Sequence, residues 1–156
     1  MTSHQWSGRL TLSVPPEQAF VAFTPRGERG WAPGWEPVFH GPADDDGAPG
    51  TVFEIVDGHG RSVWQVVDRT WPAHLRYART TPGISAGTVT VDVAPEGAGS
   101  RVDVTYRMTA LSADGEAHLA AQAADPDRSP GTWQEPVERF LGRRGAGRAG
   151  PVEVGS

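Results

Sequence analysis

Five segments in which apolar and polar residues alternate follow one another between residues 51 and 110, and turn signals separate them. A period of two is typical of strands with one buried face, and short turns such as Pro82-Gly83 join neighbouring strands into hairpins. We therefore expect an antiparallel meander, and no other feature of the chain constrains the fold as strongly. The predicted strands are residues 51–57, 61–70, 74–81, 85–94 and 101–110.

The segment before the meander is predicted to contain one strand and two short helices. Residues 6–14 alternate as a strand, and Pro15-Pro16 ends this strand and starts a helix. A second helical piece is expected over residues 26–31. It lies within residues 24–37, whose Pro, Gly and Trp content predicts a compact corner, and a polar loop follows at residues 41–50.

The C-terminal third is predicted to be helical. An Ala-rich helix over residues 112–124 stops at Pro126, and Thr132 with Glu135 three positions later fits a capping box for a second helix. Two prolines and a glycine within residues 125–131 leave the continuity of the closing helix open.

The length of 156 residues predicts one domain, because domains commonly contain about 100–200 residues. We place this domain at residues 1–141. Residues 142–156 hold five glycines and show no apolar periodicity, so a flexible tail rich in Gly and Arg is expected there.

Charge and composition exclude several classes of function. The formal charge of −5 disfavours a phosphate backbone, so no nucleic-acid partner is expected. The absence of Cys excludes disulfides, thiolate nucleophiles and Cys-type metal centres, and the absence of Lys excludes a Schiff-base lysine. We recognise neither a signal peptide nor an apolar run long enough to span a membrane, which predicts a cytoplasmic protein without membrane insertion.

Two stretches carry a resemblance to a known superfamily. Residues 14–20 (VPPEQAF) are similar to its strand-to-helix transition, and residues 23–37 (FTPRGERGWAPGWEP) resemble the F-T-P-x-G-E-x-x-W-x-x-G-W-x-P run of a bacterial subgroup. Residues 87–91 (GTVTV) and 104–112 (VTYRMTALS) are similar to its last strands and helix start. The chain thus resembles the SRPBCC (START-like, polyketide cyclase-like) superfamily over roughly residues 6–141.

The resemblance implies an α+β helix-grip fold, in which a curved antiparallel sheet wraps around a long C-terminal helix and two short helices follow the first strand. It also implies a cavity for an apolar or amphipathic small molecule. Members of the superfamily include polyketide cyclases and aromatases, lipid and hormone carriers, and activators of a chaperone ATPase, so the fold does not select one activity.

Seven aromatic side chains are predicted to surround this cavity, because strand parity or a helical stripe turns them inward. Rings of this size offer flat faces on which an aryl ligand can stack, although ordinary core packing is the alternative for each of them. Two of them, Trp31 and Trp35, also fit a structural corner. The set is Trp31, Trp35, Phe53, Trp64, Tyr77, Tyr106 and Trp133.

Four polar residues are candidates for acid–base chemistry or ligand orientation. Glu28 beside aromatic rings could act as a general acid or base, but a helix-end charge paired with an Arg is the simpler interpretation. Arg79 shares the parity of Tyr77 and could bind a carboxylate or enolate oxygen, or else extend into solvent. His40 and His59 are the histidines nearest to the predicted rim, and His59 also fits a surface turn.

No metal site and no cofactor are expected. The five histidines form no His-x-His or His-x-x-x-His pair. The run Asp44-Asp45-Asp46 lacks the spacing of a calcium loop and is predicted to be a solvated loop. We find no motif that is specific to an enzyme.

The leading hypothesis is the binding of a small hydrophobic or aromatic ligand between the sheet and the C-terminal helix, and a fully packed interior would contradict it. The alternatives are a cyclase-, aromatase- or dehydratase-like enzyme and an interaction module similar to the chaperone-ATPase activators. An exposed apolar patch together with a filled cavity would favour that module. The sequence leaves a homodimer open.

Overall fold

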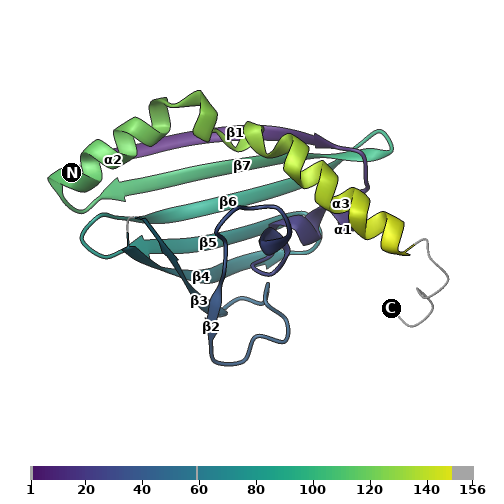
Figure 1. Ribbon diagram of the computed structural model, residues 1–156, viewed down its shortest axis with the longest axis horizontal. Coiled ribbons are helices and arrows are strands. Elements are labelled where there is room, and N and C mark those ends of the chain that lie inside the picture. Colours follow the sequence, from purple (N-terminus) through teal and green to yellow (C-terminus); the bar gives the residue numbers. More distant parts are fainter. Residues whose placement is uncertain (1, 59, 149–156) are drawn as a thin grey trace.

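The computed structural model describes residues 2–58 and 60–148 and contains one seven-stranded antiparallel sheet (Figure 1). The strand order is β1-β7-β6-β5-β4-β3-β2, so the predicted meander is confirmed and the first strand joins its far edge. The strands are β1 (Ser3–Leu12), β2 (Val38–His40), β3 (Val52–Asp57), β4 (Gly60–Thr70), β5 (His74–Thr81), β6 (Ser85–Glu96) and β7 (Gly99–Ala110).

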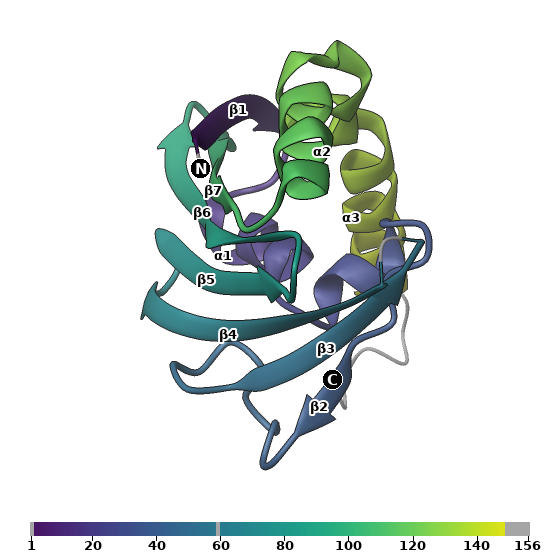
Figure 2. The ribbon, with the colours of Figure 1, turned by 90° about the vertical axis from the view of Figure 1, so that its left-hand side faces the viewer.

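The sheet curves from β1 round to β2, and the helices lie along its concave side (Figure 2). Strand β2 was not predicted, because it is three residues long and the prolines and glycines before it suggested an irregular path. It pairs with β3, where Phe39 lies opposite Phe53, and thereby lengthens the sheet beyond the meander.

The segment between β1 and β2 forms three short helices and the expected compact corner. These are α1 (Pro16–Ala19), η1 (Phe20–Phe23) and η2 (Gly27–Gly30). The indole Nε1 of Trp31 donates to the Ala22 carbonyl at 2.7 Å, and that of Trp35 donates to the Pro25 carbonyl, also at 2.7 Å. Both rings are therefore fixed to the backbone of the corner.

The C-terminal helical region is interrupted where the sequence left its continuity open. It consists of α2 (Ala113–Ala124), η3 (Pro126–Arg128), η4 (Pro130–Trp133) and α3 (Gln134–Arg148). The predicted capping box is wrong, because the Thr132 hydroxyl donates to the Ser129 carbonyl at 2.7 Å. Helix α3 continues beyond residue 141, so residues 142–148 are helical, whereas residues 149–156 of the predicted tail lie outside the described residues.

Helix α3 is held on β1 by polar and apolar contacts. The Gln134 side chain exchanges two hydrogen bonds with the Thr11 backbone, at 2.9 and 2.6 Å, and Val137 and Leu141 join the main core. A second, smaller core lies beneath α2 and contains Trp6, Met108, Ala110 and Leu119. In the described part of the chain, no helix is long and apolar enough to cross a membrane.

Candidate ligand-binding site

The seven predicted aromatic residues belong to the main core or pack against it, and their ring contacts form two groups. Trp35 and Trp64 are 5.2 Å apart between ring centroids and meet edge to face. Phe53 and Tyr77 pack against the same Trp64 ring at 5.9 and 5.6 Å. Trp31 lies 5.2 Å from Trp133, whose other neighbour is Tyr106 at 6.4 Å. The structure thus brings the set together, while its role in ligand contact stays a prediction.

These rings leave a small cavity in the interior, which we call the closed cavity because it is more enclosed than the pocket outside it. Its volume is about 20 Å³, enough for roughly one water molecule. The interior is therefore largely packed, which differs from the spacious cavity that the resemblance implied. The lining residues are Phe23, Glu28, Trp35, Trp64, Tyr77, Val89, Val91, Val104, Tyr106 and Trp133.

A second, open pocket lies directly outside this cavity. Its volume is about 200 Å³. Trp35, Trp64 and Tyr106 line both spaces and so form the partition between them. The corner contributes Pro33 and Gly34 to the outer pocket, and the remaining lining residues are Ile55, Asp57, Ser62 and Arg79.

Glu28 faces the closed cavity without a partner for its carboxyl group. It makes no side-chain hydrogen bond or ion pair with any described residue, and its burial raises the pKa of its carboxyl group well above the usual range. The expected pairing with an Arg is wrong, because the neighbouring Arg29 pairs with Glu36 at 3.2 Å. Glu28 is half-buried, and desolvation favours the neutral form of its carboxyl group.

Arg79 and Tyr106 border the outer pocket. Arg79 does not extend freely into solvent: its Nε is buried without a hydrogen-bond partner, and its guanidinium carbon lies 5.1 Å from the centre of the Trp64 ring. The Tyr106 ring stacks on Trp6 at 5.0 Å, and burial raises the pKa of its hydroxyl. Both groups can contact a molecule in the outer pocket.

Of the two candidate histidines, His40 lines neither space. His40 lies on the exposed edge strand β2 and pairs with Glu54 of β3, whose neighbours Phe53 and Ile55 point inward. The prediction that His40 lies at the cavity rim is therefore wrong, since its strand parity directs it to the outer face. His59 lies outside the described residues.

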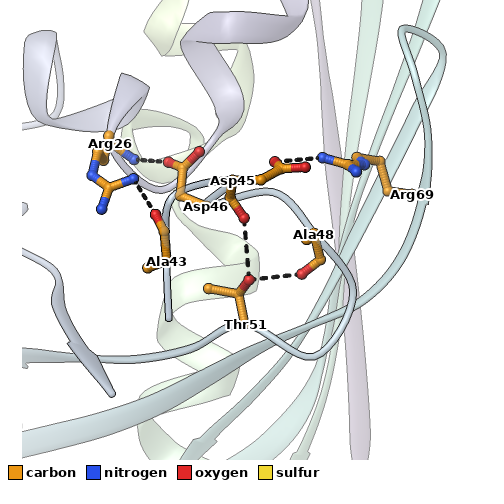
Figure 3. A network of polar contacts seen from close by, with 7 residues as sticks. All are labelled: Arg26, Ala43, Asp45, Asp46, Ala48, Thr51 and Arg69. Carbon is orange, nitrogen blue, oxygen red and sulfur yellow. Dashed lines mark hydrogen bonds and ion pairs between the residues drawn. The ribbon is translucent and has the colours of Figure 1, made fainter. Parts of the chain in front are cut away.

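The predicted polar loop at residues 41–50 is tied to the corner and to β4 (Figure 3). The Asp46 carboxylate accepts from the Arg26 backbone N–H at 2.7 Å, and Arg26 in turn donates to the Ala43 carbonyl at 2.6 Å. The Asp45 carboxylate pairs with Arg69 of β4 at 2.7 Å, and this bond lowers the pKa of Asp45. Asp44 and Asp45 are exposed, as predicted, and the bonds of Asp45 and Asp46 make the loop brace the corner that carries Glu28.

Sequence reasoning missed Ser62 and Phe23 among the residues of the site. The buried Ser62 hydroxyl accepts a hydrogen bond from Trp64 Nε1 at 3.0 Å and so orients that ring. Its place in an alternating strand, two residues before Trp64, could have revealed it. Among residues 2–58 and 60–148, no group of three or more acidic or His side chains could hold a metal ion.

The sequence matches no protein-family model and no curated protein, but solved structures share its fold. An uncharacterised protein from Rhizobium leguminosarum is 19% identical with a TM-score of 0.64, over 91% of this chain and 96% of that one. CalU16 from Micromonospora echinospora is 18% identical with a TM-score of 0.57, over 97% and 88%. Ara h 8.0201 is 15% identical with a TM-score of 0.64, over 91% and 99%. The chain has a START-like helix-grip fold.

The buried carboxyl gives a pH-dependent prediction. Glu28 binds its proton more tightly in the folded than in the unfolded chain. The free energy of unfolding of the wild type therefore falls as the pH rises above about 4.5, and this fall ends once Glu28 ionises in the folded chain. We expect Glu28→Gln to raise the free energy of unfolding at pH 7 by on the order of 1 kcal/mol. This gain should vanish near pH 4, as measured by urea denaturation at several pH values. Glu36→Gln, in an exposed ion pair, should show no such gain. Equal effects of Glu28→Gln at both pH values would contradict the assignment.

Proposed function

We propose that the protein binds a small hydrophobic or aromatic ligand and is a relative of the SRPBCC superfamily. The observation that carries this proposal is the aromatic partition, Trp35, Trp64 and Tyr106, between the open pocket and the closed cavity. A ligand ring can stack on this partition from outside, and displacement of one ring would join the two spaces. The helix-grip fold and the sequence run at residues 23–37 support the relationship.

Trp35 is the ring that can move with the least disturbance. It is half-buried and belongs to the corner, whereas Trp64 is buried in the sheet. A single hydrogen bond, to the Pro25 carbonyl, fixes its indole, and Gly34 with a φ of +74° precedes it in the chain. Movement of the loop at residues 33–35 would open the closed cavity and expose Glu28 to the ligand.

The experiment is a titration with N-phenyl-1-naphthylamine, a neutral aromatic probe that fluoresces when it leaves water. We expect saturable binding with one probe per chain, and about tenfold tighter binding to Trp35→Ala, in which the two spaces merge. Trp71→Ala removes an exposed ring (59% exposed) outside both pockets and should leave the affinity unchanged. Absence of saturable binding to both the wild type and Trp35→Ala would contradict the proposal.

An enzyme of the cyclase, aromatase or dehydratase kind is the second candidate, and one observation favours keeping it. Glu28 and Tyr106 both face the closed cavity, and Tyr106 also faces Arg79 across the outer pocket. A protonated carboxyl could act as a general acid and a guanidinium could stabilise an enolate oxygen. The test is to measure turnover of an aryl polyketide thioester by the wild type and by Glu28→Gln and Arg79→Ala. Loss of turnover in both variants would support this candidate, and unchanged turnover would show that neither residue is catalytic.

The exposed apolar side chains give less support to an interaction module. Val38 and Val63 lie on either side of Glu54 in the cross-strand register, so a carboxylate separates them. Charge within such a surface disfavours an apolar contact with a partner. The large apolar side chains exposed in the described part of the chain are Val38, Val56, Val63, Val67, Trp71 and Leu111.

A further inference from the structure

The guanidinium of Arg79 is set apart from the arginines on the outer face of the sheet. Arg9 pairs with Asp103 at 2.7 Å and Arg76 with Asp68 at 3.6 Å, so these cations have carboxylate partners. No described carboxylate forms an ion pair with Arg79, and its buried Nε donates to no acceptor. A buried N–H without an acceptor is uncommon in proteins, and a ligand is one way to supply the acceptor.

The guanidinium of Arg79 lies against an aromatic ring and lines the open outer pocket. Trp64 is its cross-strand neighbour on β4 and provides the ring beneath it. On the other side its neighbour on β6 is Gly87, above which β7 packs with the Met108 side chain. The planar fork of a guanidinium matches the two oxygens of a carboxylate.

We propose that Arg79 recognises a carboxylate and that the ligand is a planar aromatic carboxylate, an inference that rests on the proposed function. The ring of this ligand stacks on the partition formed by Trp35, Trp64 and Tyr106, and its carboxylate accepts hydrogen bonds from Arg79 in the outer pocket. Asp57 lines the same pocket.

The test compares 2-naphthoate with 2-naphthamide, which have the same ring but differ in charge, by isothermal titration calorimetry. We expect the wild type to bind 2-naphthoate about tenfold more tightly than 2-naphthamide. This preference should shrink as NaCl is raised from about 20 to 500 mM. Arg79→Gln should bind both compounds with equal affinity. Arg107→Gln removes the same charge from an exposed position of β7 and should keep the preference.

A second measurement reports on the contact itself. The ¹⁵N–¹H resonance of the Arg79 side-chain Nε, assigned by its loss in Arg79→Gln, should shift on addition of 2-naphthoate and stay in place with 2-naphthamide. Thermal melting of Arg79→Gln shows whether this variant is folded, and Arg79→Lys, which keeps the charge without the fork, should retain only part of the preference.

Different outcomes overturn the two proposals separately. Equal affinity of the wild type for both compounds, or a preference that survives in Arg79→Gln, overturns carboxylate recognition by Arg79. The same holds if N-phenyl-1-naphthylamine binds and 2-naphthoate does not. If none of the three compounds binds to the wild type or to Trp35→Ala, both the proposed function and this inference are overturned.

Discussion

Replacement of Tyr77 by Ala is expected to lower the free energy of unfolding by about 3–5 kcal/mol, the range typical of large buried aromatic residues. Tyr77 is 2% exposed and its ring meets Phe53 and Trp64 edge to face at 6.0 and 5.6 Å. Its hydroxyl donates to the Phe23 carbonyl at 2.8 Å and so connects β5 with the end of η1. Removal of the side chain would thus create a void and also detach the corner from the sheet.

Urea denaturation of two variants separates these contributions. Tyr77→Phe keeps the ring but removes the donor to Phe23, and we expect it to lose about 1–3 kcal/mol. Val56→Ala on the outer face removes an apolar side chain that is 61% exposed, and it should change stability by less than about 0.5 kcal/mol. If Tyr77→Phe is as stable as the wild type, the hydrogen bond does not hold the corner. A loss of less than about 1 kcal/mol in Tyr77→Ala would contradict the packing argument.

The packed interior changes how ligand binding must operate in this fold. An open interior cavity would admit a ligand without rearrangement, whereas here the rings themselves occupy most of that volume. Under the proposed function, the free energy of ligand contact would have to offset the displacement of at least one ring, and Trp35 is the partition ring that lies outside the sheet. The corner would then have a functional role in addition to its structural one.

The strands of the meander could be predicted because each has a single buried face. Val102, Val104 and Met108 on β7 are buried, as their alternation with charged residues indicated. The pairing of β1 with β7 joins residues about 100 positions apart, where Trp6 lies opposite Tyr106. No local pattern specifies such a partner, and this pairing was not predicted.

The site was predictable in its composition but not in its geometry. Strand parity placed Trp64 and Tyr77 on the concave face, since parity needs only the strand assignment. It failed for His40, because β2 was not recognised as a strand. The volume left between the rings depends on single contacts such as the one from Trp35 to the Pro25 carbonyl, which join residues across a corner of irregular backbone. Residue types in the sequence do not determine contacts of this kind.

The second of the two largest effects is expected for Gly27→Ala in the corner. A Cβ at this position would lie 1.8 Å from the Val21 carbonyl oxygen and 2.8 Å from Thr24 Oγ1. The Val21 oxygen is part of the backbone and also accepts from the Thr24 hydroxyl at 2.9 Å, so it cannot rotate away. The clash must be relieved by separating η2 from η1, which would move Glu28, and we expect a loss of about 3 kcal/mol.

Gly34→Ala is the matched control in the same corner. No atom lies within 4 Å of the position that a Cβ would take there, but the φ of +74° makes Ala unfavourable, by about 1 kcal/mol. Urea denaturation should therefore rank Gly27→Ala well below Gly34→Ala in stability. Near-ultraviolet circular dichroism should show altered Trp signals in Gly27→Ala, because Trp31 and Trp35 follow η2 in the chain. Equal stability of the two variants would show that the corner accommodates a Cβ at Gly27 with little rearrangement. The close approach of η2 to η1 would then not determine the position of Glu28 at the closed cavity.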